Sequence, residues 1–157
     1  MLNTTRPKTI IASAIVFTVL GLGACQSNTL KKDPEKGVQV RTQLAAEYIR
    51  TGDLDSAKRS LDQALKVDSR DAKANMMMGI LLQQEGSKPN MEKADAYFKR
   101  AISSEPDNAQ ARNNYGTYLY QLQRYNDAIE QFTRAGAALG YDQRYQSLEN
   151  LGRIYLK

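Results

Sequence analysis

The 157-residue sequence has no histidine, no tryptophan and a single cysteine, Cys25. Without histidine there is no histidine general base and no histidine-ligated metal, and one cysteine cannot form an internal disulfide. Net charge is also small, because 22 Lys and Arg residues against 17 Asp and Glu residues leave only +5, with the two signs interspersed. These absences predict a binding protein with no catalytic residues, cofactor or metal, and they argue against a nucleic-acid-binding surface.

Long apolar runs are scarce as well, and the longest uncharged one is Ile10–Leu22, which has thirteen residues. It is too short for a membrane-spanning helix, which needs about 20 apolar residues. Two basic residues, Arg6 and Lys8, precede the run, and small residues follow it. This order is typical of a signal peptide, which we predict over residues 1–24.

The end of this run, Leu22-Gly23-Ala24-Cys25, resembles the lipobox of bacterial lipoproteins. In that class, cleavage precedes the cysteine, which is then lipidated and anchors the protein to a membrane. The resemblance implies that Cys25 is lipidated. In the same class of proteins, a residue such as Gln26 after the cysteine implies transfer of the protein to the outer membrane, at its periplasmic face. The alternative is an ordinary secretory peptide with a chance cysteine. The polar residues that follow predict a flexible tether, so that residues 25–37 comprise the lipidated cysteine and this tether.

The first segment with a clear helical pattern is Leu44–Asp68, which reads as two short helices around the turn Gly52-Asp53. Gly52 suits a left-handed C-terminal cap, and Asp53 can cap the N terminus of the second helix. One such hairpin cannot bury its own apolar stripe, so it needs copies of itself. Its apolar or small residues have the i, i+3, i+4, i+7 spacing of one helical face: Leu44, Ala45, Tyr48, Ala57, Leu61, Ala64 and Leu65.

The pattern recurs, and it resembles the tetratricopeptide repeat, a helix-turn-helix unit of 34 residues. The resemblance implies an all-α right-handed superhelix whose concave face is lined by the first helix of each unit. We expect the second unit's extra residues between its helices, at 87–91, and we expect Gly136 and Gly140 to loosen the end of the third unit. The repeat domain is predicted over 38–157, with units at 38–71, 72–108 and 109–144 and the start of a fourth at 145–157.

Small residues recur where the first helix of each unit would approach the second, and large apolar residues recur where they would fill the layer between units. Such a division of sizes at equivalent positions is typical of a packed core. The small residues are Ala45, Gly79, Gly116 and Gly152, and the large ones are Leu61, Phe98 and Phe132.

Residues on the inner side of the first helices predict a partner-binding groove. Ile49, Met76, Ile80 and Tyr120 would form an apolar stripe with polar neighbours, which suits an amphipathic helix or an extended peptide. The alternative is that Ile49 and Ile80 pack against neighbouring repeats and that Tyr120 buries its ring. The repeat's carboxylate clamp needs a Lys and Asn pair where Thr42 and Ala46 stand, so no clamp is expected. The predicted groove residues are Thr42, Ala46, Ile49, Met76, Ile80, Gln83, Asn113, Thr117 and Tyr120.

Taken in order, these features resemble the type IV pilus biogenesis lipoproteins of the PilF/PilW kind. A lipobox and a short polar tether lead to residues 44–65, LAAEYIRTGDLDSAKRSLDQAL. The stretches GILLQQEG, KADAYFKRAI and NNYGTYLY of the second and third units are similar to theirs as well. The resemblance covers essentially the whole chain.

Membership would imply a pilotin, a protein that binds secretin subunits in the periplasm and brings them to the outer membrane. There the secretin assembles into the ring through which pili pass, and twitching motility would follow. The alternative is a repeat lipoprotein that recruits cell-wall enzymes or assists outer-membrane protein assembly. Those lipoproteins have longer arrays of repeats than this sequence. We therefore expect either that the reading frame is incomplete or that a shortened array of repeats suffices for function.

Overall fold

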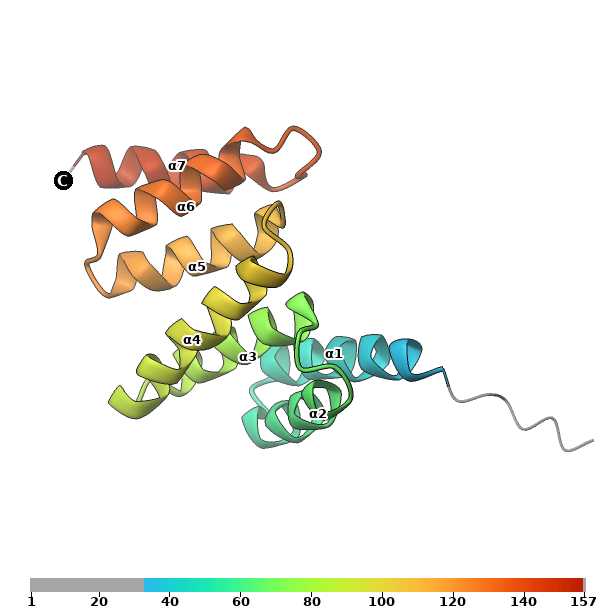
Figure 1. The fold of residues 1–157 in the computed structure, drawn as a ribbon. Helices are drawn as coiled ribbons and strands as arrows, with labels where there is room; N and C mark the ends of the chain where they lie inside the picture. Colours follow the sequence, from blue (N-terminus) through green and yellow to red (C-terminus); the bar gives the residue numbers. More distant parts are fainter. Residues whose placement is uncertain (1–32, 157) are drawn as a thin grey trace, which may run out of the picture. The chain divides into compact units, whose positions relative to one another are not determined.

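The computed structural model describes residues 33–156, and this part of the chain consists of helices without strands (Figure 1). The all-α class predicted from the repeat is therefore confirmed. The predicted signal peptide, the lipidated cysteine and most of the tether lie outside the described residues. The helices of the described part are α1 (Pro34–Thr51), α2 (Leu54–Val67), α3 (Ala72–Glu85), α4 (Lys88–Ser104), α5 (Ala109–Gln121), α6 (Tyr125–Ala137) and α7 (Arg144–Tyr155).

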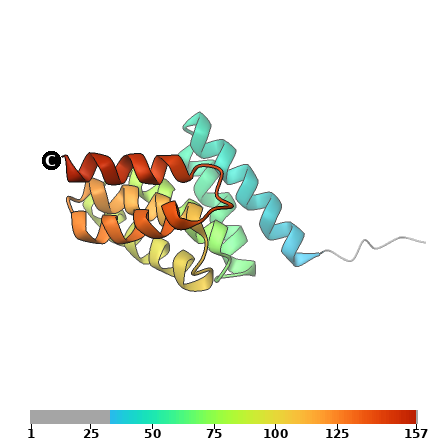
Figure 2. The same cartoon turned by 90° about the horizontal axis from the view of Figure 1, so that it is seen from above.

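The helices pack in the order in which they occur in the chain. α1 packs against α2, α3 against α4, α5 against α6, and α7 against α6. The first helices also contact one another in series, α1 with α3, α3 with α5, and α5 with α7. Figure 2 shows α6 and α7 side by side and α1 inclined to both, as expected when each hairpin is rotated relative to the one before it. Three hairpins and the first helix of a fourth unit are thus present, as the repeat predicts.

Residues at the turns set the ends of the helices. Gly52 has a φ of 83° at the end of α1, and Asp53 Oδ1 accepts a 3.0 Å hydrogen bond from the Ser56 amide at the start of α2. Both caps agree with the sequence prediction. Asp71 and Asn108 cap α3 and α5 in the same way, since a side-chain oxygen satisfies an N–H group that has no partner within the helix.

Two glycines of the first helices lie directly against aromatic rings of the second helices. A Cβ added at Gly79 would be 3.0 Å from Phe98, and one added at Gly116 would be 2.7 Å from Phe132. The predicted close approach of the first helix to the second is therefore confirmed in the second and third units, and the phenylalanines expected to fill the layer between units contact these glycines within each unit. At Gly152 a Cβ would meet nothing within 4 Å, because α7 is the last helix that the structure describes.

The first helix begins earlier than predicted. α1 starts at Pro34, one turn before the predicted boundary at Val38. The side chain of Asp33 accepts hydrogen bonds of 3.1 Å and 3.3 Å from the amides of Glu35 and Lys36, and proline is well suited to the first position of a helix. The predicted boundary was wrong because it depended on apolar periodicity, and the first turn of α1 carries none.

The extra residues of the second unit lengthen α4 and not the turn before it. Residues 88–91, predicted between the two helices, are the first turn of α4. Ser87 Oγ accepts a 3.4 Å hydrogen bond from the Asn90 amide, and Pro89 fits the first turn of a helix. The prediction was wrong because serine and proline are typical of loops and of helix starts alike.

Two side-chain expectations are also corrected. Gly136 was expected to loosen the end of the third unit, but it is buried inside α6, where a Cβ would be 2.8 Å from Leu148 Cδ2. The glycine therefore lets α7 approach closely, and only Gly140 lies in the connecting loop. Leu44, expected in the apolar stripe of the first hairpin, is 44% exposed, whereas its neighbour Ala45 is completely buried.

Candidate protein-binding groove

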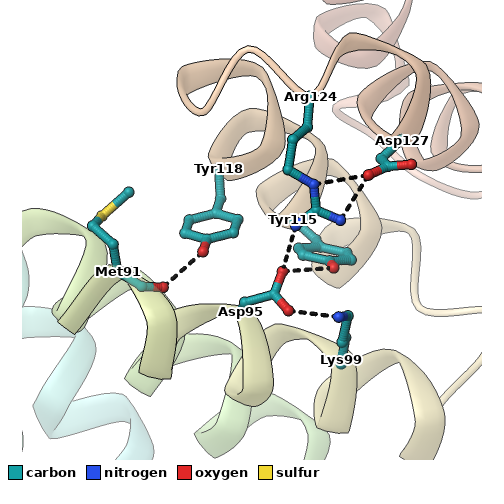
Figure 3. Close-up of polar contacts among 7 residues, drawn as sticks. All are labelled: Met91, Asp95, Lys99, Tyr115, Tyr118, Arg124 and Asp127. Carbon is teal, nitrogen blue, oxygen red and sulfur yellow. Dashed lines mark hydrogen bonds and ion pairs between the residues drawn. The ribbon is translucent and has the colours of Figure 1, made fainter. Parts of the chain in front are cut away.

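A polar network joins the second hairpin to the third (Figure 3). Asp95 of α4 accepts hydrogen bonds of 3.0 Å from the Tyr115 hydroxyl and 3.0 Å from Arg124 Nη1, and its other oxygen is 2.6 Å from Lys99 Nζ. Burial alone would raise the pKa of Asp95, but the hydrogen bonds from Lys99 and Tyr115 and the positive charge nearby lower it overall. Burial and the bond to the carboxylate raise the pKa of Tyr115 well above that of free tyrosine.

Aromatic packing supports the same junction. The Phe98 ring of α4 lies 5.6 Å from the Tyr115 ring and 5.3 Å from the Tyr118 ring, both of which belong to α5. The Tyr118 hydroxyl donates a 2.7 Å hydrogen bond to the backbone oxygen of Met91, at the start of α4. Because α3 packs on the same α4, these contacts hold α3 and α5 at a fixed spacing.

Between α3 and α5 this spacing leaves an open groove of about 330 Å³. Gln83 Nε2 of α3 donates a 2.7 Å hydrogen bond to Gln121 Oε1 of α5 and so bridges the groove. On α3 the lining residues Gln83 and Gln84 follow Ile80 by three and four positions, and on α5 the lining residues are three, four or seven positions apart, which places each set on one helical face. The lining residues are Ile80, Gln83, Gln84, Asn114, Thr117 and Gln121.

The described residues that line this groove are uncharged, and all except Ile80 are polar. Asn114 Nδ2 donates a 3.0 Å hydrogen bond to the backbone oxygen of Gln110, and Thr117 Oγ1 donates one of 3.0 Å to that of Asn113. Amide side chains carry both donors and acceptors, so they can bond the backbone of a bound peptide irrespective of its sequence. The groove offers no positive charge for a terminal carboxylate.

The face continues from α3 to α1. A hollow of about 250 Å³ lies there, and Lys73 contributes the positive charge and Asp71 the negative charge among its lining residues. The first helices therefore form two neighbouring concave sites, the groove lined by uncharged residues and the hollow lined in part by charged ones. The remaining residues of this hollow are Gln39, Thr42 and Gln43.

Three of the nine predicted groove residues, Ile80, Gln83 and Thr117, line the groove between α3 and α5. Four others are buried and lie outside the groove between α3 and α5, although Thr42 contributes to the smaller hollow between α1 and α3; these are Thr42, Ile49, Met76 and Asn113.

Polar atoms of two of these residues show how they are enclosed. Asn113 Oδ1 accepts a 2.8 Å hydrogen bond from the hydroxyl of Ser147 on α7, in a buried position. Thr42 Oγ1 is buried without a hydrogen-bond partner within residues 33–156. The prediction that Ile49, Met76 and Asn113 are open to a partner is therefore corrected, and the burial of Ile49 in the apolar core agrees with the alternative that it packs against neighbouring repeats.

The other two predicted residues are partly exposed but lie outside the groove. Ala46 is on α1, and the Tyr120 ring lies 5.6 Å from that of Tyr125. Asn114 lines the groove and was missing from the prediction. Its position three residues before Thr117, on the same face of the helix, is the sequence signal that could have identified it.

The described part of the chain holds neither a membrane-spanning helix nor a cluster of metal ligands. No helix in residues 33–156 combines the length and apolar character that crossing a membrane requires. Over the same residues, no three or more Asp, Glu, Cys or His side chains gather in a way that could hold a metal ion.

Comparison with known families gives one match that spans most of the described residues. The family model of the tetratricopeptide repeat matches residues 42–90 and 90–142. A solved structure with this fold, the type III secretion translocator chaperone SycD of Yersinia enterocolitica, was determined in complex with a peptide of the translocator YopD. It has a TM-score of 0.65 at 13% identity and covers 77% of this chain and 94% of its own, so it supports the fold alone.

Greater similarity is found to proteins of type IV pili. The chain is 30% identical to the type IV pilus assembly protein PilF of Pseudomonas aeruginosa in an alignment of 155 residues that covers 95% of this chain and 60% of PilF. The solved structure of PilF has a TM-score of 0.74 at 30% identity, over 78% of this chain and 54% of that one. The structure of PilW, a type IV pilus biogenesis factor, has a TM-score of 0.68 at 31% identity, over 74% and 52%. The chain thus spans little more than half the length of these proteins.

Proposed function

The chain belongs to the tetratricopeptide-repeat family, and from its similarity to PilF we propose that it is a protein-binding adaptor of type IV pilus biogenesis. The observation that carries this proposal is 30% identity over 95% of the chain. The repeat fold by itself is shared at only 13% identity, as with SycD, so the fold cannot account for that similarity.

Within this process we propose the role of a pilotin. A lipid attached to Cys25 would hold the protein at the periplasmic face of the outer membrane, and the repeats would bind a secretin subunit. The lipobox-like sequence before Cys25 and the open groove in the repeats support the two halves of this proposal. Joining an anchor to a binding module raises the effective concentration of the bound partner at the membrane.

The groove between α3 and α5 is the part of the repeats best suited to hold the secretin segment. Ile80 supplies an apolar contact, and Gln83, Asn114 and Thr117 supply hydrogen-bonding groups around it. This combination fits an extended segment or a helix that inserts one apolar side chain and otherwise makes uncharged hydrogen bonds with the groove. A bound segment would replace water on the amide groups without the cost of desolvating a charge.

The pilotin role is tested by deleting the gene and measuring secretin multimers in outer-membrane fractions. We expect the multimers to disappear from the outer-membrane fraction, because they are either lost or retained in the inner membrane. The wild-type gene should restore them to the outer membrane, and the Cys25→Ser variant should not. Unchanged multimers in the deletion strain would reject the pilotin role.

The groove is tested separately with a double variant, Ile80→Glu with Thr117→Arg. We expect it to weaken binding of purified secretin at least about tenfold, since central contacts dominate binding energy. Leu44→Glu is the matched control, because it also places a charge on an exposed apolar position of a first helix but lies outside the groove. Equal binding by the control and the double variant would show that the groove is not the binding surface.

A further inference from the structure

A second cavity lies where the loop between α4 and α5 meets the end of α6. It has a volume of about 470 Å³ and shares no lining residue with the groove between α3 and α5. Two arginines, Arg112 of α5 and Arg134 of α6, contribute to its wall. The remaining lining residues are Pro106, Asp107, Ala137 and Ala138.

Arg112 is unusual because it is only 5% exposed and its hydrogen-bond acceptors are uncharged. Its Nε donates a 2.7 Å hydrogen bond to the backbone oxygen of Pro106, and its Nη1 donates one of 2.8 Å to Gln131 Oε1. The ion pairs within 4.0 Å among residues 33–156 do not include Arg112. A buried guanidinium without an anion is costly, because its charge has lost water and gained no counter-charge.

The same two positions of the other units hold one cation and one amide. In the first unit, Arg41 Nε donates a 3.3 Å hydrogen bond to Gln63 Oε1. In the second unit the roles are exchanged, and Arg100 Nη1 donates a 3.2 Å hydrogen bond to Asn75 Oδ1. Each arginine is thus matched by a neutral acceptor from the facing helix.

The third unit departs from this rule, because Arg112 stands in the place of Arg41 and Asn75, and Arg134 stands in the place of Gln63 and Arg100. Two cations therefore meet where the other units pair a cation with an amide. Burial lowers the pKa of Arg112, and the positive charge of Arg134 lowers it further.

Two carboxylates act in the opposite direction, since Glu130 and Asp107 raise the pKa of Arg112. Both are exposed, and neither is within ion-pair distance of Arg112 in the described structure. Asp107 is among the residues that line the cavity, whereas Glu130 is not. The local excess of positive charge therefore faces the cavity.

We propose that this cavity binds a small oxyanion, a carboxylate or a phosphate group, between Arg112 and Arg134. Guanidinium groups bind such anions through paired, charge-assisted hydrogen bonds. The small side chains of Ala137 and Ala138 leave room for the body that carries the anionic group. The bound anion would neutralise the like charges of the two arginines and fasten the end of α6 to the start of α5.

The test uses the purified full chain titrated with inorganic phosphate and with succinate at constant ionic strength, followed by calorimetry and thermal unfolding. Saturable binding with a raised melting temperature is expected. Whichever anion binds more tightly shows whether the natural ligand carries a phosphate or a carboxylate group. Arg134→Gln is the variant of choice because Arg134 is exposed, so the fold is retained, and glutamine copies Gln63 of the first unit. It should weaken binding about tenfold or more, the usual effect of losing a hydrogen bond to a charged group.

Arg100→Gln is the matched control, because it removes the same charge at the equivalent position of the second unit. It should leave anion affinity unchanged, while Arg134→Lys should retain part of it. The proposal is overturned if neither anion binds saturably, or if Arg100→Gln and Arg134→Gln weaken binding equally, which would indicate a general effect of net charge.

Discussion

The Tyr115 hydroxyl donates a 3.0 Å hydrogen bond to Oδ1 of Asp95, and this bond joins α5 of the third hairpin to α4 of the second (Figure 3). Arg124 reaches the same oxygen from the turn after α5, so one carboxylate fastens two elements of the third hairpin. Since α3 is paired with α4, the bond indirectly determines how far α5 lies from α3 and thus the width of the candidate groove.

Tyr115→Phe should therefore lower the free energy of unfolding by about 1.5 kcal/mol, the usual loss when a hydrogen bond to a charged group is removed. The ring would still pack against Phe98, so the loss is confined to the hydroxyl. Urea unfolding followed by circular dichroism measures it. Tyr155→Phe serves as the control, because that side chain is 71% exposed, and a loss of equal size in the control would contradict the role of the bond.

Stability should also fall in acid through Asp95. The pKa of this carboxyl is lowered in the folded protein, so the folded state favours its charged form. The contribution to stability is present above the ordinary carboxyl pKa of 3.8 and is lost as the pH falls through the lower pKa of the folded state. Asp95→Asn should be less stable than the wild type at pH 7, and the difference should narrow below about pH 4. A difference that does not change with pH would refute this account.

Alanine substitution should have opposite effects at two glycines of the first helices. Gly116→Ala places a methyl group 2.7 Å from the buried ring of Phe132 and should destabilise the fold by about 1–3 kcal/mol, the range for overpacking. Gly152→Ala meets open space within a helix and should stabilise it by about 0.5–1 kcal/mol. Thermal unfolding of both variants checks the sign, and stabilisation by Gly116→Ala would contradict the close helix approach.

Glutamate substitution separates core from groove on α3. Met76 is 1% exposed, so Met76→Glu buries a carboxylate without a partner and should cost about 3 kcal/mol or more. Ile80 is partly exposed at the groove, so Ile80→Glu should cost about 1 kcal/mol and leave a folded protein. Chemical denaturation of each single variant gives both values. Equal losses would mean that the two side chains share one environment.

Much of the fold could be predicted from the sequence because its signals are local. A cap depends on one side chain and the few amides that follow it, as with Asp53 and Ser56. The small residues that let the first helix of a unit approach the second also recur at equivalent positions of the units, so the close approach can be predicted without knowing how the hairpins stack. The same reasoning failed at α1, where the first turn has a cap but no apolar residue to mark it.

The inner face of the repeats was only partly predictable, because it depends on the angle at which one hairpin meets the next. Met76 and Ile80 are one turn apart on α3 and look equivalent in the sequence, yet the first is buried between helices and the second lines the groove. The meeting of Arg112 and Arg134 likewise requires two helices to be brought together.

The sequence by itself determined the helical hairpins, their caps and their repetition, since these follow from the periodicity and chemistry of neighbouring residues. Only the tertiary structure decided which inner side chains are enclosed, where the groove opens and which charges face each other. Those outcomes depend on the packing of residues that are far apart in the chain, and no local pattern records that packing.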